Sequence, residues 1–180
     1  SFQGNYGMDA SNRSAEIDIR PHRVLGMYQP DAIATYVVDG KSYIVTANEG
    51  DSRDYDGYSE EDRIADLVLD PEVFPNAAAM QEDENLGRLN TTLANGDIDQ
   101  DGMNELIYAY GARSFSIWDE NGNLVYDSGS EFERRLAQLD PEHFNSTNDD
   151  NDSFKNRSDD KGPEPEAVNI ATIDGAVYAF

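Results

Sequence analysis

The sequence has no cysteine, which excludes a thiol nucleophile, a cysteine-ligated zinc ion and a disulfide framework. Basic residues are scarce too: 13 Lys and Arg stand against 37 Asp and Glu, giving a formal net charge of −24. The chain therefore lacks the cations that replace the counterions of nucleic acids and anionic membranes. No apolar run approaches the ~20 residues of a membrane span. We expect no nucleic-acid partner and no direct membrane insertion.

The acidic residues that dominate the chain attract hard divalent cations, which prefer oxygen ligands. The same composition is typical of a solvated surface without metal. Only the spacing of the acidic residues can therefore distinguish a metal-binding protein from one with a solvated acidic surface. The 10 Tyr and 7 Phe provide enough apolar surface for a folded core in a chain of 180 residues. The chain begins at Ser1 without an initiator Met and ends inside the apolar run 176–180. We interpret it as a fragment of a longer protein.

Strand patterns separated by tight turns predict a mainly β fold. β-Branched and aromatic runs flank Asp39-Gly40, Asn121-Gly122 and Asp174-Gly175, and such dipeptides favour hairpin turns. The sequence predicts three hairpin regions from these signals, near 32–47, 105–128 and 168–180, with a single strand over 105–110 at the start of the second.

The segments between the hairpins, 51–96 and 130–165, are interpreted as insertions that carry short helices. The firmest helical pattern covers 130–139, with Ser130 as N-cap and Glu133 completing a capping box. Two weaker patterns suggest helices over 59–69 and 76–84. The whole chain, 1–180, is then one fragment of a larger domain.

An internal repeat suggests how the hairpins are arranged. Pro30-Asp31-Ala32-Ile33 recurs as Pro165-Glu166-Ala167-Val168, and the turn glycine and the return-strand tyrosine recur at the same offset. Repeated antiparallel units are typical of the blades of a β-propeller. Chance similarity between two hairpins is the alternative. The repeat favours a fragment of a β-propeller with short helical insertions.

The sharpest motif of the chain is Asp97-Ile98-Asp99-Gln100-Asp101-Gly102-Met103-Asn104-Glu105. Alternating carboxylates on a tight loop, a glycine for the turn and a closing acid can surround one Ca²⁺ with six or seven oxygens. The twelfth position of an EF-hand would fall on Tyr108, inside an apolar strand, so the loop is a shorter kind. We predict a calcium site there, formed by four carboxylates and one backbone carbonyl: Asp97, Asp99, Asp101, Glu105 and the carbonyl of Met103.

Further acids gather where strands begin or end. Glu49 and Asp51 follow the first hairpin, where they either line a metal site or pair with Arg53 in a structural role. By the repeat, Asp31 and Glu166 hold equivalent places at the starts of blade strands, which often face the central channel of a propeller. A second set of metal-ligand candidates follows from these positions: Asp31, Glu49, Asp51, Glu164 and Glu166.

Several longer motifs resemble the choice-of-anchor I domain, a family of secreted bacterial proteins related to mesenchyme-specific cell-surface glycoproteins of biomineralising animals. The resemblance covers nearly the whole chain and is carried by five segments, 26–34, 46–51, 111–118, 144–150 and 161–166. It implies a longer propeller-like domain and a secreted or cell-surface location. Ala167 departs from the glycine that many relatives have there. Some members are described as alkaline phosphatase or phytase-like, but no catalytic residue transfers to this chain.

Two functions fit these features. The favoured one is a calcium-binding extracellular β-propeller module with a binding, matrix or surface role, whose partners are calcium, other segments of the same propeller and an extracellular matrix or phosphate-bearing ligand. The alternative is a calcium-dependent phosphoester hydrolase, in which channel calcium would bind phosphate and activate water. That reaction needs cations near the metals, and only Arg53, Arg113 and Lys161 are candidates.

Overall fold

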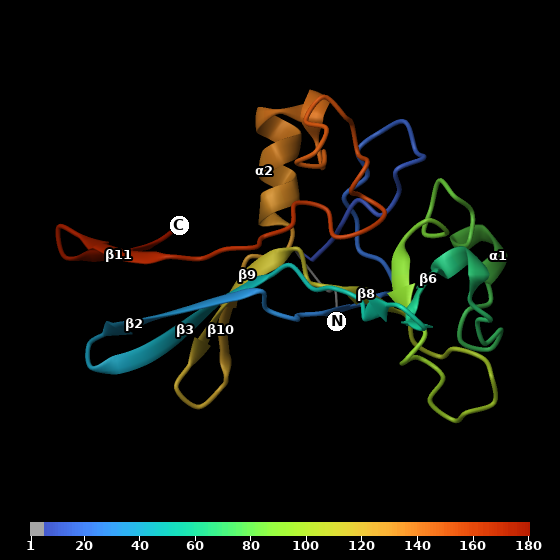
Figure 1. Ribbon diagram of the computed structural model, residues 1–180, viewed down its shortest axis with the longest axis horizontal. Coiled ribbons are helices and arrows are strands. Elements are labelled where there is room, and N and C mark those ends of the chain that lie inside the picture. Colours follow the sequence, from blue (N-terminus) through green and yellow to red (C-terminus); the bar gives the residue numbers. More distant parts are fainter. Residues whose placement is uncertain (1–5) are drawn as a thin grey trace.

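The computed structural model describes residues 6–180, and an antiparallel sheet of four strands runs through it (Figure 1). Residues 1–5 of the expected fragment lie outside this description. The sheet has the order β10-β9-β3-β2, so its strands are neighbours in space in the order in which they occur in the chain. Its members are β2 (Ala32–Val38), β3 (Lys41–Asn48), β9 (Ser114–Asp119) and β10 (Leu124–Asp127).

The predicted turns form where the sequence places them. Asp39 and Gly40 adopt positive φ values of 51° and 74°, as a two-residue hairpin turn requires, and Val38 pairs with Lys41 across it. Strands β11 (Ile170–Ile173) and β12 (Ala176–Ala179) form a similar hairpin in a sheet of their own. In Figure 1 this hairpin extends to the same side as the β2–β3 hairpin, and β11 contacts β2. The prediction of a mainly β fold is confirmed.

One feature of the sheet was not expected from the local patterns. The first two predicted hairpins belong to one sheet, because Val45 of β3 pairs with Ile117 of β9. Residues 49–113 leave the sheet after β3 and return to it at β9. The segment that the sequence describes as an insertion therefore lies between two adjacent strands.

The hydrophobic core lies in this excursion and in the N-terminal segment. Ile64, Phe74, Leu89 and Ile107 are each at most 2% exposed and belong to one contiguous cluster. Short strand pairs frame it: β6 (Glu61–Arg63) with β7 (Asn90–Thr92), β1 (Leu25–Met27) in parallel with β8 (Tyr108–Tyr110), and β4 (Asp54–Tyr55) with β5 (Tyr58–Ser59).

The helices are shorter than expected. The helix predicted over 59–69 is wrong, because residues 61–63 pair with β7 and only the 3₁₀ turn η1 (Ile64–Asp66) follows. Tertiary pairing overrides a weak local preference here. The pattern over 76–84 gives only α1 (Ala77–Met80). No helix within residues 6–180 is long and apolar enough to cross a membrane.

The third predicted helix is present as α2 (Glu131–Leu139), followed by the 3₁₀ turn η2 (Pro141–His143). Phe132 packs against Phe115 of the sheet, with 6.0 Å between the ring centroids. The capping-box role of Glu133 is wrong. Its side chain is 1% exposed and points into the protein, where it accepts a hydrogen bond from the backbone amide of Asp9.

Candidate metal centre

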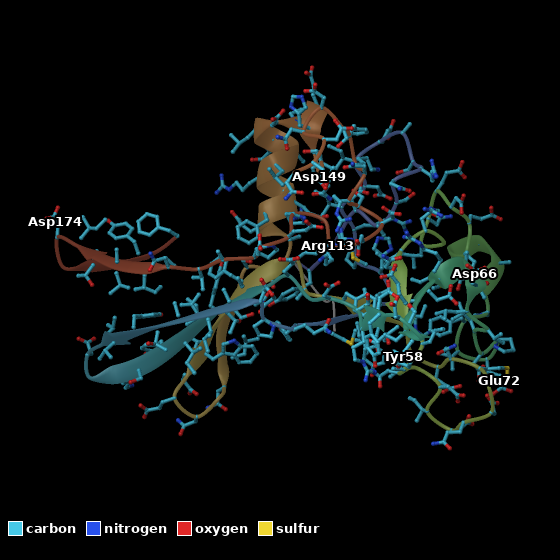
Figure 2. The ribbon with its side chains drawn as sticks, viewed as in Figure 1. Tyr58, Asp66, Glu72, Arg113, Asp149 and Asp174 are labelled. Atoms are coloured by element: carbon cyan, nitrogen blue, oxygen red, sulfur yellow. The ribbon has the colours of Figure 1, made fainter. Side chains whose placement is uncertain are left out.

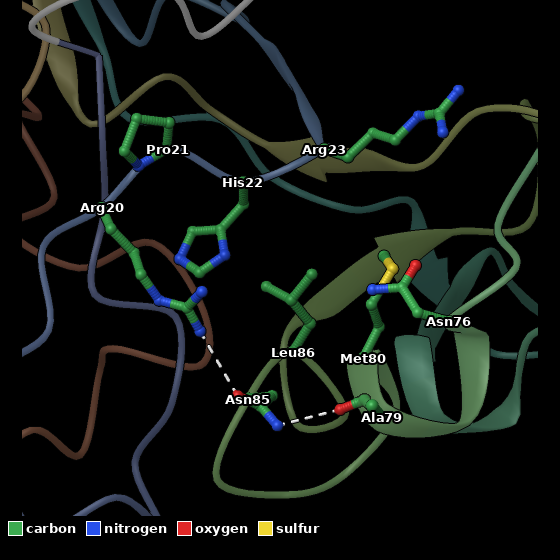
Figure 3. Close-up of a pocket in the computed structure, with 9 residues that line it drawn as sticks. All are labelled: Arg20, Pro21, His22, Arg23, Asn76, Ala79, Met80, Asn85 and Leu86. Carbon is green, nitrogen blue, oxygen red and sulfur yellow. Dashed lines mark hydrogen bonds between the residues drawn. The ribbon is translucent and has the colours of Figure 1, made fainter.

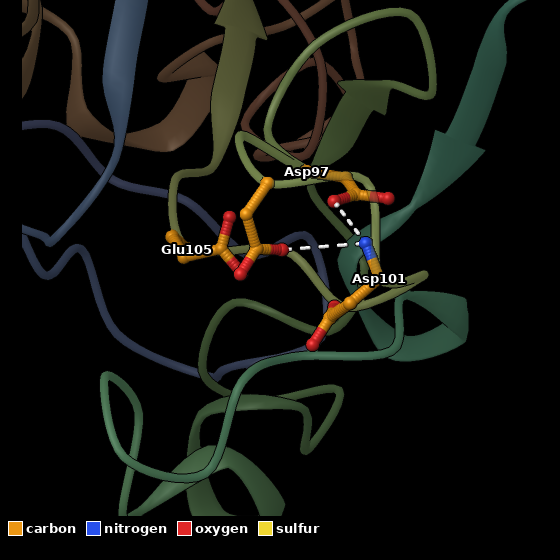
Figure 4. A group of neighbouring side chains, drawn as sticks. Asp97, Asp101 and Glu105 are labelled. Carbon is orange, nitrogen blue, oxygen red and sulfur yellow. Dashed lines mark hydrogen bonds between the residues drawn. The ribbon is translucent and has the colours of Figure 1, made fainter.

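The loop 97–105 folds its own amides onto its own carboxylates. Asp97 Oδ1 accepts hydrogen bonds from the amides of Gln100 (2.7 Å) and Asp101 (3.2 Å), and Asp97 Oδ2 accepts one from Gly102 (3.0 Å). Gly102 has a φ of 92°, which a glycine adopts without strain. The tight turn brings Asp97, Asp101 and Glu105 round one side of the loop (Figure 4).

Glu105 closes this loop from the following segment. Its Oε2 accepts a hydrogen bond of 2.7 Å from the amide of Ile98, whereas its Oε1 is buried and has no hydrogen-bond partner within residues 6–180. Carboxylate oxygens of Asp97, Asp99, Asp101 and Glu105 lie within 4.8 Å of one another, and we call these four residues the loop group. The expected residues are thus together. The role of the Met103 carbonyl stays a prediction; its amide donates to Asp101 Oδ1.

A second group assembles from three distant segments. Carboxylate oxygens of Asp31, Glu49 and Glu166 also lie within 4.8 Å of one another, and we call these residues the three-segment group. Asp31 precedes β2, Glu49 follows β3 and Glu166 precedes β11. The position of Asp31 is fixed by its amide, which donates to the carbonyl of Ala47 at 2.9 Å. This is the juxtaposition that the internal repeat suggested for Asp31 and Glu166.

Two of the predicted ligands lie apart from this group. Asp51 has an 84% exposed side chain, with one oxygen 3.9 Å from Lys161 Nζ. Glu164 is paired with Arg157. The structure therefore does not bring Asp51 or Glu164 together with Asp31.

The backbone around Glu49 is held by two glycines. Gly111 has a φ of 66°, and a Cβ atom built on it would lie 1.5 Å from the carbonyl oxygen of Glu49. A Cβ atom on Gly50 would lie 2.1 Å from the amide nitrogen of Gly111. A side chain at Gly111 would displace the Glu49 backbone, and one at Gly50 would displace the Gly111 backbone, so the two glycines permit the close approach that places Glu49.

Lys161 supplies the cation of the three-segment group. Its Nζ donates to Glu49 Oε1 at 2.8 Å, and both side chains are largely buried. Burial alone lowers the pKa of Lys161, but the hydrogen bond and the charge of Glu49 outweigh it and raise the pKa above its ordinary value. Lys161 is therefore charged at neutral pH and occupies one of the oxygens that a metal would use.

Arg113 is a structural residue, contrary to the expectation that it is available for phosphate. Its guanidinium is buried and donates to the carbonyl of Asp9 and to Glu133 Oε1, both at 2.7 Å. The other terminal nitrogen donates to the carbonyls of Ser158 and Asp160. Burial raises the pKa of Glu133, although the charge of Arg113 and the donated hydrogen bonds oppose the rise.

Arg53 is engaged as well. Its Nε donates to Glu60 Oε2 at 2.9 Å, so it pairs with a residue outside the acidic stretch that follows the first hairpin. Of the three cations considered for phosphate binding, Arg53 and Arg113 are thus committed to other partners, which weighs against the hydrolase alternative.

Sequence reasoning missed a buried ion pair beside Arg113. Lys155 Nζ lies 2.9 Å from Asp9 Oδ2, and both side chains are 1% exposed. Lys155 also donates to Ser14 Oγ at 2.6 Å. No sequence signal distinguishes this lysine, because it stands in an Asp- and Asn-rich stretch that reads as solvated. The pair ties the segment 144–162 to the N-terminal segment.

Together these features define an acidic, mainly β module with two groups of convergent carboxylates. Residues 2–180 match the choice-of-anchor I domain family, and the chain belongs to that family. This membership indicates a surface-related, extracellular role. The chain is also similar to Gigasin-3a of Magallana gigas, with 35% identity over 107 residues. That match covers 57% of this chain but 37% of Gigasin-3a. No solved structure matches the chain.

Proposed function

We propose that this chain is a calcium-binding module of an extracellular β-propeller, and that the loop group holds one Ca²⁺. The observation that carries the proposal is Glu105 Oε1, a buried carboxylate oxygen without a hydrogen-bond partner in the described chain. A buried charged oxygen is costly unless it is paired or bound to a metal. Three further carboxylates lie beside it, and a divalent cation would relieve their mutual repulsion.

The proposed propeller is supported by the strand order of the large sheet. Four antiparallel strands that are neighbours in sequence order, β2, β3, β9 and β10, are the composition of one propeller blade. The β11–β12 hairpin would then begin a second blade, because it shares with the β2–β3 hairpin the Pro-acid-Ala start, the Asp-Gly turn and the tyrosine of the return strand. The convergence of Asp31 and Glu166 just before these two hairpins fits a shared central channel. Further segments of the same propeller are, after calcium, an expected partner of the module.

Thermal unfolding with added calcium tests the metal. Bound calcium stabilises the folded state by about 2.7 kcal/mol when its free concentration is 100-fold above Kd. For a chain of this size that corresponds to about 5–10 °C in Tm. Chelator should lower the Tm, and calcium should restore it. Sodium chloride at equal ionic strength should not, since it screens charge without ligating the carboxylates.

Glu105→Gln locates the effect, because the amide keeps the shape of the side chain but removes its charge. This variant should lose most of the calcium-dependent rise in Tm. Glu142→Gln, the same substitution at an exposed position of η2, is the matched control and should respond to calcium like the unsubstituted chain. An equal calcium response in the two variants, or equal recovery with sodium chloride, would contradict the proposal.

A further inference from the structure

A cavity of about 330 Å³ lies between the N-terminal segment and the α1 region (Figure 3). Its lining differs in charge from the two acidic groups. Its lining includes Arg20, His22 and Arg23 on one side and Asn76, Asn85 and Leu86 on the other. None of the lining residues is an Asp or a Glu, although the chain has 37 of them. The cavity is therefore a local exception to the charge of the molecule.

Arg20 is held in place at both its ends. Its backbone exchanges two hydrogen bonds with Met8, of 3.1 and 3.3 Å. Its Nε donates to Asp18 at 2.6 Å and its Nη2 to Asn85 Oδ1 at 3.3 Å, while Asn85 Nδ2 donates to the carbonyl of Ala79. Within residues 6–180 the Nη1 group has no hydrogen-bond partner. The Nη1 group of Arg20 is therefore a positioned hydrogen-bond donor that is available to a ligand.

His22 lies beside this guanidinium and differs from it in chemistry. Its Nε2 is 3.1 Å from the carbonyl of Met8, so Nε2 carries the proton and donates, and Nδ1 is left as an acceptor. Burial first, and then the charge of Arg20, lower the pKa of His22 to about 4, with Arg113 acting in the same direction and Asp18 opposing. The imidazole is neutral at physiological pH, so the cavity offers a cationic donor next to a neutral acceptor.

We propose that this cavity binds a small oxyanion that carries one proton, namely hydrogen phosphate or the monoanion of a phosphomonoester. The Nη1 group of Arg20 donates to a charged oxygen, and His22 Nδ1 accepts a hydrogen bond from the P–OH group. Leu86 and Met80 line the cavity with apolar surface suited to the ester carbon. Arg23 adds only its field, because its guanidinium lies 4.8 Å from the Phe74 ring and is turned away from Arg20 in Figure 3.

The paired donor and acceptor give this site a pH profile. A phosphomonoester loses its second proton with a pKa of about 6. The complex holds one proton more than the free dianion, whether that proton stays on the phosphate or moves to His22. Affinity should therefore fall about tenfold per pH unit above 6, and it should also change below pH 4, where His22 itself becomes protonated.

Nuclear magnetic resonance of the imidazole groups tests the site, since the chain has only two histidines. The full chain is titrated with methyl phosphate at pH 5.5, where calcium phosphate stays dissolved. The His22 signals should shift and saturate, while those of His143, which is paired with Asp140, should stay constant. Sulfate and acetate, which carry no acidic proton at this pH or only a small fraction of one, should bind at least tenfold more weakly.

Two variants distinguish specific binding in the cavity from a non-specific effect of positive charge. Arg20→Gln should weaken methyl phosphate binding at least tenfold. Arg135→Gln, on the exposed face of α2, removes the same charge without touching the cavity and should leave binding unchanged. A Tm close to that of the unsubstituted chain establishes that each variant is folded. Equal binding by the two variants, or sulfate binding as tightly as methyl phosphate, would overturn the proposal, and neither result bears on calcium.

Discussion

The loop group draws its four carboxylates from nine consecutive residues, whereas the three-segment group draws Asp31, Glu49 and Glu166 from parts of the chain that are far apart in sequence. In the loop group the backbone amides of the loop hold the acids in place. In the three-segment group the fold does this, through the strand ends and the glycines around Glu49. The first group can therefore survive local damage elsewhere, while the second depends on the whole structure.

Arg113→Met should have the largest effect on the difference between the two groups. It leaves Glu133 buried and unpaired, and removing one partner of a buried ion pair costs about 3–5 kcal/mol of unfolding free energy. It also releases the carbonyls of Ser158 and Asp160, which lie in the segment that leads to Glu166. We predict a second, weaker calcium site at the three-segment group. Urea unfolding of Arg113→Met should show the loss of stability, and calcium titration should show the three-segment group impaired and the loop group intact.

Arg135→Met is the control for this change, because Arg135 is exposed and its pairing with Glu131 contributes less than about 1 kcal/mol. Replacing both partners, in Arg113→Met with Glu133→Leu, should recover part of the loss, since no buried charge is then left alone. A loss in Arg113→Met as small as in the control would mean that the buried network does not hold this region together.

Neutralising one acid in each group should show how much each group contributes to calcium binding. Glu105→Gln and Glu166→Gln should each remove calcium binding at their own group only. We expect the larger effect, tenfold or more in Kd (about 1.4 kcal/mol), from Glu105→Gln, because the loop group has four carboxylates and no competing lysine. Calorimetric titration of the two variants and of the double variant measures this. A loss of both sites in either single variant would show that the groups are not independent.

The smallest expected effect is a gain. Lys161→Met removes the cation that occupies Glu49, so calcium affinity at the three-segment group should rise several-fold, while the loop group stays unchanged. Lys41→Met, at an exposed position of β3, controls for the change in net charge. If affinity falls instead, Lys161 positions Glu49 for the metal and does not compete with it.

The same contrast explains what the sequence predicts. The loop group is visible in the sequence because its spacing, turn glycine and closing acid are all local. The convergence of Asp31 with Glu166 was suggested by a repeat, which carries long-range information within one chain. The pairing of Lys161 with Glu49 and of Lys155 with Asp9 has no local signature, because it depends on tertiary packing. Glu133 was misread for this reason: its spacing from Ser130 matches a capping box, but its partner is Arg113.

The excursion between β3 and β9 has a consequence for the order of folding. The β2–β3 hairpin and the β9–β10 hairpin close across short turns, and hairpins of this kind form within microseconds. The pairing of β3 with β9 must close a loop that contains the whole segment 49–113, and its entropic cost is lower once that segment has already become compact. We therefore expect the central pair of the sheet to form late, so that substitutions at Val45 and Ile117 accelerate unfolding more than they slow folding.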